Sequence, residues 1–239
     1  SCLLAVMTDN SDDKNFPPGK RQYTLDFAYH GGIYRDVWMI GKSSVAITDA
    51  LEADKVAGGG VFVHFDNISG KKAEVYVDTE VHNSGKRTRT VAVETVLADA
   101  GDVPVKRISQ QVKLQAGESK TVRQQFAVRN PKLWSPDSPY LYRIQSRVKA
   151  GHEVLDGGVT RVGIRKAEFK GKDGFWLNGK PFGQLVGANR HQDFAYVGNA
   201  LPNSQQWRDA KRLRDAGCTI IRVAHYPQDP AFMDACDEM

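Results

Sequence analysis

The sequence predicts a mainly β chain in which an immunoglobulin-like sandwich precedes the first βα units of a (β/α)8 barrel. Three observations lead to this prediction. Residues 50–162 contain roughly seven short runs of alternating apolar and polar side chains, separated by turns. Residues 187–225 contain two apolar segments on either side of a helical periodicity. Residues 1–49 contain a few β-rich segments without closing partners, which are typical of the last part of another sandwich.

Composition excludes several classes of protein. The chain has 239 residues, of which 41% are hydrophobic and 26% charged, an ordinary composition for one or two folded domains. The net charge is +5, but the basic residues are scattered in pairs without a stripe, which argues against nucleic acid as a partner. No apolar run approaches the length of a membrane span, so no membrane partner is expected.

The cysteines and the first residues add little about redox chemistry or location. Cys2, Cys218 and Cys236 are widely spaced and odd in number, which fits neither a zinc site nor a disulfide framework. The apolar run at residues 3–7 is too short for a signal-peptide core and lacks a basic leader, so it predicts a strand. The compartment stays open, because a periplasmic and a cytoplasmic location both fit.

Residues 1–49 and 50–162 differ in how regular their patterns are. In the first segment, residues 10–20 are turn formers and predict a loop, and residues 33–40 predict a strand. In the second, the alternation predicts a sheet with one buried and one wet face. Its isolated histidines indicate solvated sheet positions rather than a catalytic site: His64, His82 and His152.

Residues 163–239 change to a βα pattern. A hairpin is predicted at 175–182, with Asn178-Gly179 at its turn. Strands at 187–191 and at 218–227, each ending in polar residues, flank a helix capped by Asn203 or Ser204, and a second helix follows Asp229 and Pro230. We expect Trp207, Ala210 and Leu213 on the inner face of the first helix, and Gly217 as its left-handed end.

The ends of the two predicted parallel strands carry candidate functional residues. Such ends meet at one rim, so we expect His191, Arg222 and His225 to lie together there. One histidine at a strand end is more often structural, whereas two with neighbouring cations favour a site. Since a full barrel needs roughly 250 residues, the segment after Gly163 holds only its opening, and the chain is expected to be a fragment.

Six short motifs lie along nearly the whole chain. They are Asp26 with Gly31-Gly32-Ile33-Tyr34-Arg35-Asp36-Val37; Leu133-Trp134-Ser135-Pro136 with Pro139-Tyr140-Leu141-Tyr142; Val162-Gly163-Ile164-Arg165; Leu177-Asn178-Gly179-Lys180-Pro181; Gly187-Ala188-Asn189-Arg190-His191; and Ile221-Arg222-Val223-Ala224-His225-Tyr226-Pro227 with Cys236-Asp237-Glu238. These motifs resemble those of glycoside hydrolase family 2, which includes β-galactosidases, β-glucuronidases and β-mannosidases. One motif would be weak evidence, but six in the family's order are strong evidence.

The resemblance implies a domain plan and a reaction. Residues 1–49 would be the C-terminal part of a jelly-roll sugar-binding domain, 50–162 the immunoglobulin-like sandwich, and 163–239 the truncated start of the (β/α)8 catalytic barrel. Family members hydrolyse β-glycosides with retention, using two glutamates about 5–5.5 Å apart. Neither can be identified before Met239, so no catalytic residue is assigned and residues 1–239 alone are expected to be inactive.

The resemblance also implies which residues hold the substrate, an oligo- or disaccharide β-glycoside. Asp26 matches an aspartate that reaches from the sugar-binding domain and, together with a sodium ion, holds the region of the galactose 6-hydroxyl. Phe27 and Tyr29 are its aromatic neighbours in the sequence. Sodium and magnesium, and a homo-oligomer, are implied for the intact enzyme. The remaining substrate-binding candidates are Asn189, Arg190, His191, Arg222 and His225.

The identity of the sugar is less sharply predicted. By resemblance, the glucuronidase branch has a lysine at the position of Arg190, so Arg190 favours a β-galactosidase acting on terminal β-D-galactosides. Gln192, in contrast, departs from the glutamate that is frequent in galactosidases. β-Glucuronidase and β-mannosidase therefore stay open. A non-catalytic carbohydrate-binding module is the alternative from another class, and the β-α-β unit at 187–225 argues against it.

Overall fold

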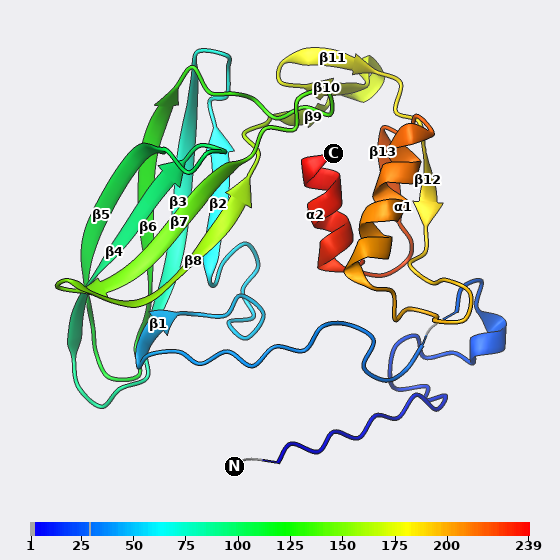
Figure 1. Ribbon diagram of the computed structural model, residues 1–239, viewed down its shortest axis with the longest axis horizontal. Helices are drawn as coiled ribbons and strands as arrows, with labels where there is room; N and C mark the ends of the chain where they lie inside the picture. The colour runs from blue at the N-terminus through cyan, green and yellow to red at the C-terminus, as the bar shows by residue number, and fades with distance from the viewer. Residues whose placement is uncertain (1–2, 29) are drawn as a thin grey trace. The chain divides into compact units, whose positions relative to one another are not determined.

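The computed structural model describes residues 3–28 and 30–239 (Figure 1). By their contacts these residues form two compact units, one of residues 40–184 and the other of the residues up to 39 together with 185–239. The strand at 45–47 pairs within the sandwich, so the first unit begins before the boundary expected at residue 49, while the expected boundaries at 49 and 162 stay predictions. The assignment of residues 1–49 to a jelly roll stays a prediction.

Residues 40–184 contain the predicted sandwich, whose neighbouring strands are all antiparallel. The two sheets face each other in Figure 1. The central strand of the first sheet is β3 (Lys72–Asn83). It pairs with the short strands β1 (Val45–Ile47) and β2 (Val61–Asp66) on one side and with the long strand β6 (Ser119–Arg129) on the other.

The second sheet has the order β5-β4-β7-β8. Its strands are β4 (Arg89–Ala98), β5 (Pro104–Leu114), β7 (Tyr142–Ala150) and β8 (Glu153–Val162). Strands β2 to β8 all lie within residues 50–162, so the expectation of about seven strands in this segment is confirmed.

The core of the sandwich forms where the alternating apolar side chains of both sheets meet. Val75 and Val77 of β3 and Ile144 of β7 are fully buried there. One buried polar link also joins the two sheets: Gln124 of β6 donates to the carbonyl of Val93 (3.0 Å) and accepts from the hydroxyl of Thr95. Its amide is therefore satisfied in an apolar setting, which removes the cost of burying it.

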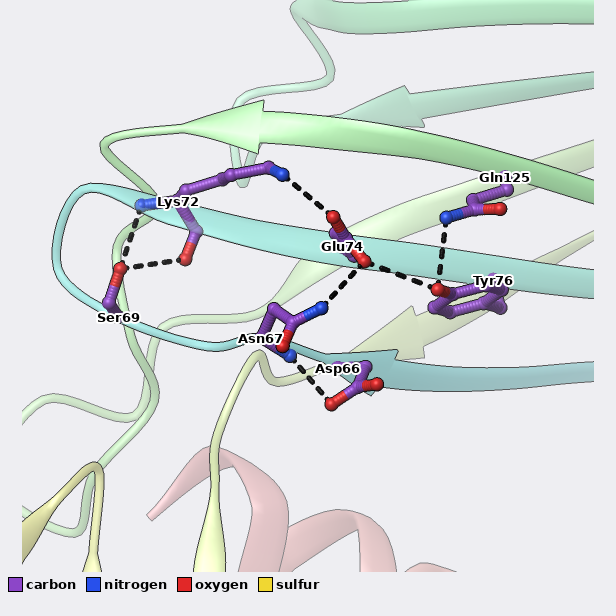
Figure 2. A network of polar contacts seen from close by, with 7 residues as sticks. All are labelled: Asp66, Asn67, Ser69, Lys72, Glu74, Tyr76 and Gln125. Atoms are coloured by element: carbon purple, nitrogen blue, oxygen red, sulfur yellow. Dashed lines mark hydrogen bonds and ion pairs between the residues drawn. The ribbon is translucent and has the colours of Figure 1, made fainter.

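The outer face of the first sheet carries a polar network, drawn in Figure 2. The Glu74 carboxylate accepts from Lys72 (2.7 Å), from Asn67 (2.9 Å) and from the Tyr76 hydroxyl (3.2 Å), and Gln125 donates to Tyr76. The bonds from Lys72 and Asn67 lower the pKa of the Glu74 carboxyl. This face of the sheet is therefore polar and partly exposed to solvent, as the alternating pattern of the strands predicts.

A small three-stranded sheet follows the sandwich, with the hairpin predicted at 175–182. Asn178 and Gly179 at its turn both have positive φ, as a tight hairpin turn requires, so this prediction is confirmed. The elements are β9 (Ala167–Phe169), the 3₁₀ helix η2 (Gly171–Asp173), β10 (Phe175–Leu177) and β11 (Lys180–Gly183).

Three of the sequence motifs meet around Trp134 and join the hairpin to the sandwich. The Arg165 guanidinium lies 4.5 Å from the centre of the Trp134 ring, and Asn178 donates to the Trp134 carbonyl. Gly163 must be glycine, because a Cβ there would lie 2.8 Å from the indole. These motifs therefore have a structural role.

The residues before 40 differ from the prediction. The segments at 3–7 and 33–40 do not form strands, and the regular element described here is the 3₁₀ helix η1 (Gln22–Thr24). The side chain of Leu3, for example, is 96% exposed. The apolar and β-rich composition of these segments was a poor guide, because a strand also needs a neighbour to satisfy its peptide groups, and the described residues provide none for them.

The second unit contains the predicted β-α-β arrangement. Its parallel strands pair directly and its helices pack on each other. Trp207, Ala210 and Leu213 lie in the cluster between the helices, as expected. The elements are β12 (Gly187–Arg190), α1 (Asn203–Asp215), β13 (Ile220–Val223) and α2 (Pro230–Glu238). Among the helices of the described chain, none has the length and apolar character that a membrane crossing needs.

The helix ends were predicted with mixed success. Asp229 accepts from the amide of Ala231 (2.8 Å) and Pro230 opens α2, and Gly217 after α1 has a φ of +86°, all as expected. The cap of α1 was wrong: Pro202 is the N-cap residue and no side chain caps the helix. Asn203 instead donates to Asp36 (3.3 Å).

The buried core of the sandwich predicts a clear contrast between two substitutions. Ile144→Ala should lower the free energy of unfolding by about 3 kcal/mol, because it leaves a cavity at a fully buried position. Val159→Ala is the matched control on β8, where the side chain is 61% exposed, and should change stability by less than about 0.5 kcal/mol. Urea unfolding measures both, and equal losses would contradict the assignment of the core.

Candidate functional site

The site is built on the parallel pairing of β12 with β13. Asn189 lies opposite Arg222, and Arg190 lies opposite Val223. A Cβ on Gly187 would lie 1.7 Å from the carbonyl oxygen of Ile220, so only glycine allows the strands to approach this closely. Because both strands run in the same direction, the residues that follow them meet at one edge of the sheet.

Two imidazoles and two aromatic rings gather at that edge. The rings of His191 and His225 are 5.3 Å apart between centroids, in an edge-to-face arrangement. Phe27 lies beside both, at 6.2 and 5.6 Å, and also beside Tyr226 at 5.9 Å. The loop before residue 39 therefore contributes an apolar ring to the site formed after β12 and β13.

Asp26 brings a carboxylate to the same cluster. Its Oδ2 atom lies 4.0 Å from Nε2 of His225, and its side chain is 84% exposed, so a solvent-borne molecule can reach it. The structure thus brings together Asp26, His191 and His225, as the sequence predicted. Tyr29, the other aromatic residue expected beside Asp26, lies outside the described residues, as does Cys2.

Arg190 does not lie at the exposed edge of the site, where the resemblance implied a substrate-binding residue. Its side chain is only 5% exposed, and its guanidinium donates to Gln228, to Gln206 (2.8 Å) and to the Asp209 carboxylate (2.7 Å). It also lies over the ring of Phe232, at 4.0 Å. Successive side chains of a strand point to opposite sides, so Arg190 faces the helices. Its expected contact with sugar hydroxyls is therefore not supported by this geometry.

Asn189 and Arg222 form a pair of their own. Arg222 Nη1 donates to Asn189 Oδ1 over 3.4 Å, and both residues are exposed. They are neighbours because the strand register sets them opposite each other. Their side chains are accessible at the strand ends, and their contact with a substrate stays a prediction.

A layer of contacts behind the imidazoles was missed by the sequence analysis. Gln192 is 1% exposed; its backbone amide donates to the Tyr226 hydroxyl (3.2 Å), and its side-chain oxygen accepts from the amide of Asp229 (2.8 Å). Burial raises the pKa of the Tyr226 phenol, so the hydroxyl stays protonated at neutral pH. The only sequence signal was that Gln192 departs from the family pattern.

The motif before residue 39 also holds the loop after β13. Arg35 donates to the carbonyl of Pro227, two residues after His225. Together with the Asn203–Asp36 bond, this contact ties the segment around residues 33–36 to the site. Arg35 therefore acts through the backbone after His225, whereas Asp36 contacts the first residue of α1.

The cluster suits recognition of hydroxyl groups. Each neutral imidazole can donate one hydrogen bond and accept another, and a carboxylate can accept two. Apolar ring surface beside such polar groups is the usual make-up of a small-molecule site. Among the described residues, no group of three His, Cys, Asp or Glu side chains has the arrangement of a metal site. The sodium contact of Asp26 stays a prediction.

Comparison with protein families decides what this architecture is. Residues 60–165 match the model of glycosyl hydrolases family 2, and residues 168–239 match the model of that family's TIM barrel domain. The chain belongs to glycosyl hydrolase family 2. The sandwich and the β-α-β unit are thus parts of the family 2 fold.

Several family 2 proteins resemble this chain along nearly its whole length. It is 33% identical to a β-galactosidase of Thermoanaerobacter pseudethanolicus and 32% identical to a putative β-glucuronidase of Formosa agariphila, in both cases over 99% of the chain. A crystal structure of a putative β-galactosidase from Bacteroides fragilis matches 96% of the chain with a TM-score of 0.87 and 31% identity. The chain covers 30%, 26% and 33% of these proteins, respectively.

The close approach at Gly187 predicts a local effect on this family 2 site. Gly187→Ala should destabilise the second unit by about 3 kcal/mol, the upper end of overpacking costs, because the new methyl group would displace the Ile220 carbonyl. Hydrogen exchange in residues 185–239 should become faster. Gly158→Ala in β8 is the control, since a Cβ there meets nothing within 4 Å. Unchanged exchange in β12 would contradict the close packing.

Proposed function

We propose that this chain supplies the sugar-binding part of the active site of a retaining exo-β-glycosidase that acts on terminal β-D-galactosides. The proposal rests on membership of family 2 and on the cluster of Asp26, His191 and His225. Relatives named β-galactosidase and β-glucuronidase support a β-glycoside as substrate. The two glutamates that the reaction needs are not assigned to any residue of the chain.

The meeting of Asp26 with the two imidazoles is the observation that carries the proposal. A hexose presents several hydroxyl groups at fixed angles, and this cluster offers donors and acceptors from several directions. Phe27 adds an apolar surface beside them. In this proposal, hydrogen bonds from His191 and His225 tighten as the transition state forms, so they contribute to rate as well as to binding.

The charge of Asp26 favours a neutral sugar over a uronic acid. An exposed carboxylate 4.0 Å from His225 would repel the carboxylate of a glucuronide held at the same place. A galactose hydroxyl, by contrast, can donate to it. This argument replaces the one from Arg190, whose buried side chain already has partners within the protein.

A β-glucuronidase is the second candidate because of Arg222. Its exposed guanidinium at the end of β13 is a planar cation that suits a carboxylate. A glucuronide placed toward Arg222 and away from Asp26 would avoid the repulsion. The two candidates therefore differ in which of these charged side chains determines the preference for the sugar.

Removing either imidazole tests the proposed role in catalysis. In the full-length enzyme that contains this chain, His191→Ala and His225→Ala should each lower kcat/KM for p-nitrophenyl β-D-galactoside on the order of 100-fold, with little change in Tm. The control is His152→Ala, at an exposed position of the sandwich. A lower Tm with unchanged kinetics would instead show that the two histidines are structural.

Neutralising Asp26 tests the choice of sugar. Asp26→Asn should lower kcat/KM for the galactoside about tenfold, because the amide is a weaker acceptor, and should raise the relative rate on p-nitrophenyl β-D-glucuronide. Asp137→Asn, at an exposed carboxylate of the sandwich, is the matched control. If the glucuronide is the better substrate and Arg222→Gln abolishes its hydrolysis, the galactoside proposal is wrong and the second candidate is correct.

A further inference from the structure

Two side chains on either side of His191 connect it to the segment that carries His225. Arg190, the last residue of β12, donates to the side chain of Gln228. Gln192, on the other side of His191, accepts from the amide of Asp229 and donates through its own amide to Tyr226. His191 therefore has a cross-link on each side, and both lead to the same loop.

His225 lies within that loop and is bracketed in the same way. The amide of Ala224, just before it, donates to the carbonyl of Arg190 (3.0 Å), while Tyr226, just after it, receives the bond from Gln192. The residues on both sides of His225 are thus connected to the backbone of the residues on both sides of His191. The spacing between the two imidazoles follows from these four cross-links.

Arg190 connects this pair of loops to the helices behind them. Its guanidinium reaches Asp209 and Gln206 of α1 and lies over Phe232 of α2. A planar fork can make these bonds together with the one to Gln228, whereas a lysine ammonium has a single nitrogen and could reach only some of the partners. Burial of the guanidinium is tolerable because Asp209 and two amide oxygens compensate its charge.

We propose that Arg190 is a positioning residue: it holds His191 and His225 at their spacing through Gln228 and α1, and does not touch the substrate. Gln192 holds the same two loops together through its bonds to Tyr226 and Asp229. The inference rests on the proposed function only in taking these two imidazoles as the sugar-binding groups. It reassigns Arg190 from a ligand-binding residue to a residue that organises the site.

The test compares variants of the ¹⁵N-labelled chain by NMR. Arg190→Lys keeps the charge but removes the fork, and Gln228→Leu removes one cross-link while leaving the Arg190–Asp209 pair in place. Both should weaken or abolish the nuclear Overhauser effects between the ring protons of His191 and His225. The matched control is Arg208→Lys, which changes an exposed arginine of α1. The sandwich histidines should keep their signals in every variant.

Binding of methyl β-D-galactoside gives the second readout, and we expect a roughly tenfold weaker Kd in both variants. Unchanged ring contacts in both would overturn the inference. Loss of ordered structure throughout residues 185–239 in both would overturn it too, since the network would then be needed for folding. If the ring contacts respond but the parent chain binds no galactoside, the positioning role stands and the proposed function fails.

Discussion

The parallel pairing of β12 with β13 is the constraint on which the candidate site depends. It places the residues after both strands at one edge, and Gly187 permits it because no Cβ stands between its backbone and the Ile220 carbonyl. A parallel pair cannot be closed by a tight turn, so α1 provides the connection and at the same time supplies partners for Arg190. Folding of this unit and assembly of the site are therefore coupled.

The division of the site into exposed and buried layers follows from strand alternation. His191, His225 and Asp26 are accessible and can exchange hydrogen bonds with a ligand. Arg190 and Gln192 are buried, and their polar groups bond to the protein. These hydrogen bonds restrict the conformations available to the loops that carry the imidazoles.

The sandwich shows that residues of a family motif need not belong to a functional site. Trp134, Gly163, Arg165 and Asn178 belong to three of the family motifs, yet their contacts join the hairpin to the sandwich. Motif residues near the imidazoles behave in a similar way, because Arg35 holds the backbone after His225. A motif thus identifies the family, while the surroundings of each side chain decide what that residue does.

The sequence by itself determined the local elements and the family. The strands of the sandwich, the hairpin turn at Asn178-Gly179 and the start of α2 at Asp229 depend on periodicity and turn chemistry, which act over a few residues. The sequence could not show that residues 3–7 and 33–40 lack strand partners, or that Arg190 finds its hydrogen-bond partners within the protein, because these outcomes depend on residues elsewhere in the chain. Only the tertiary structure brings Asp26 to His225, since contacts between distant segments set that distance.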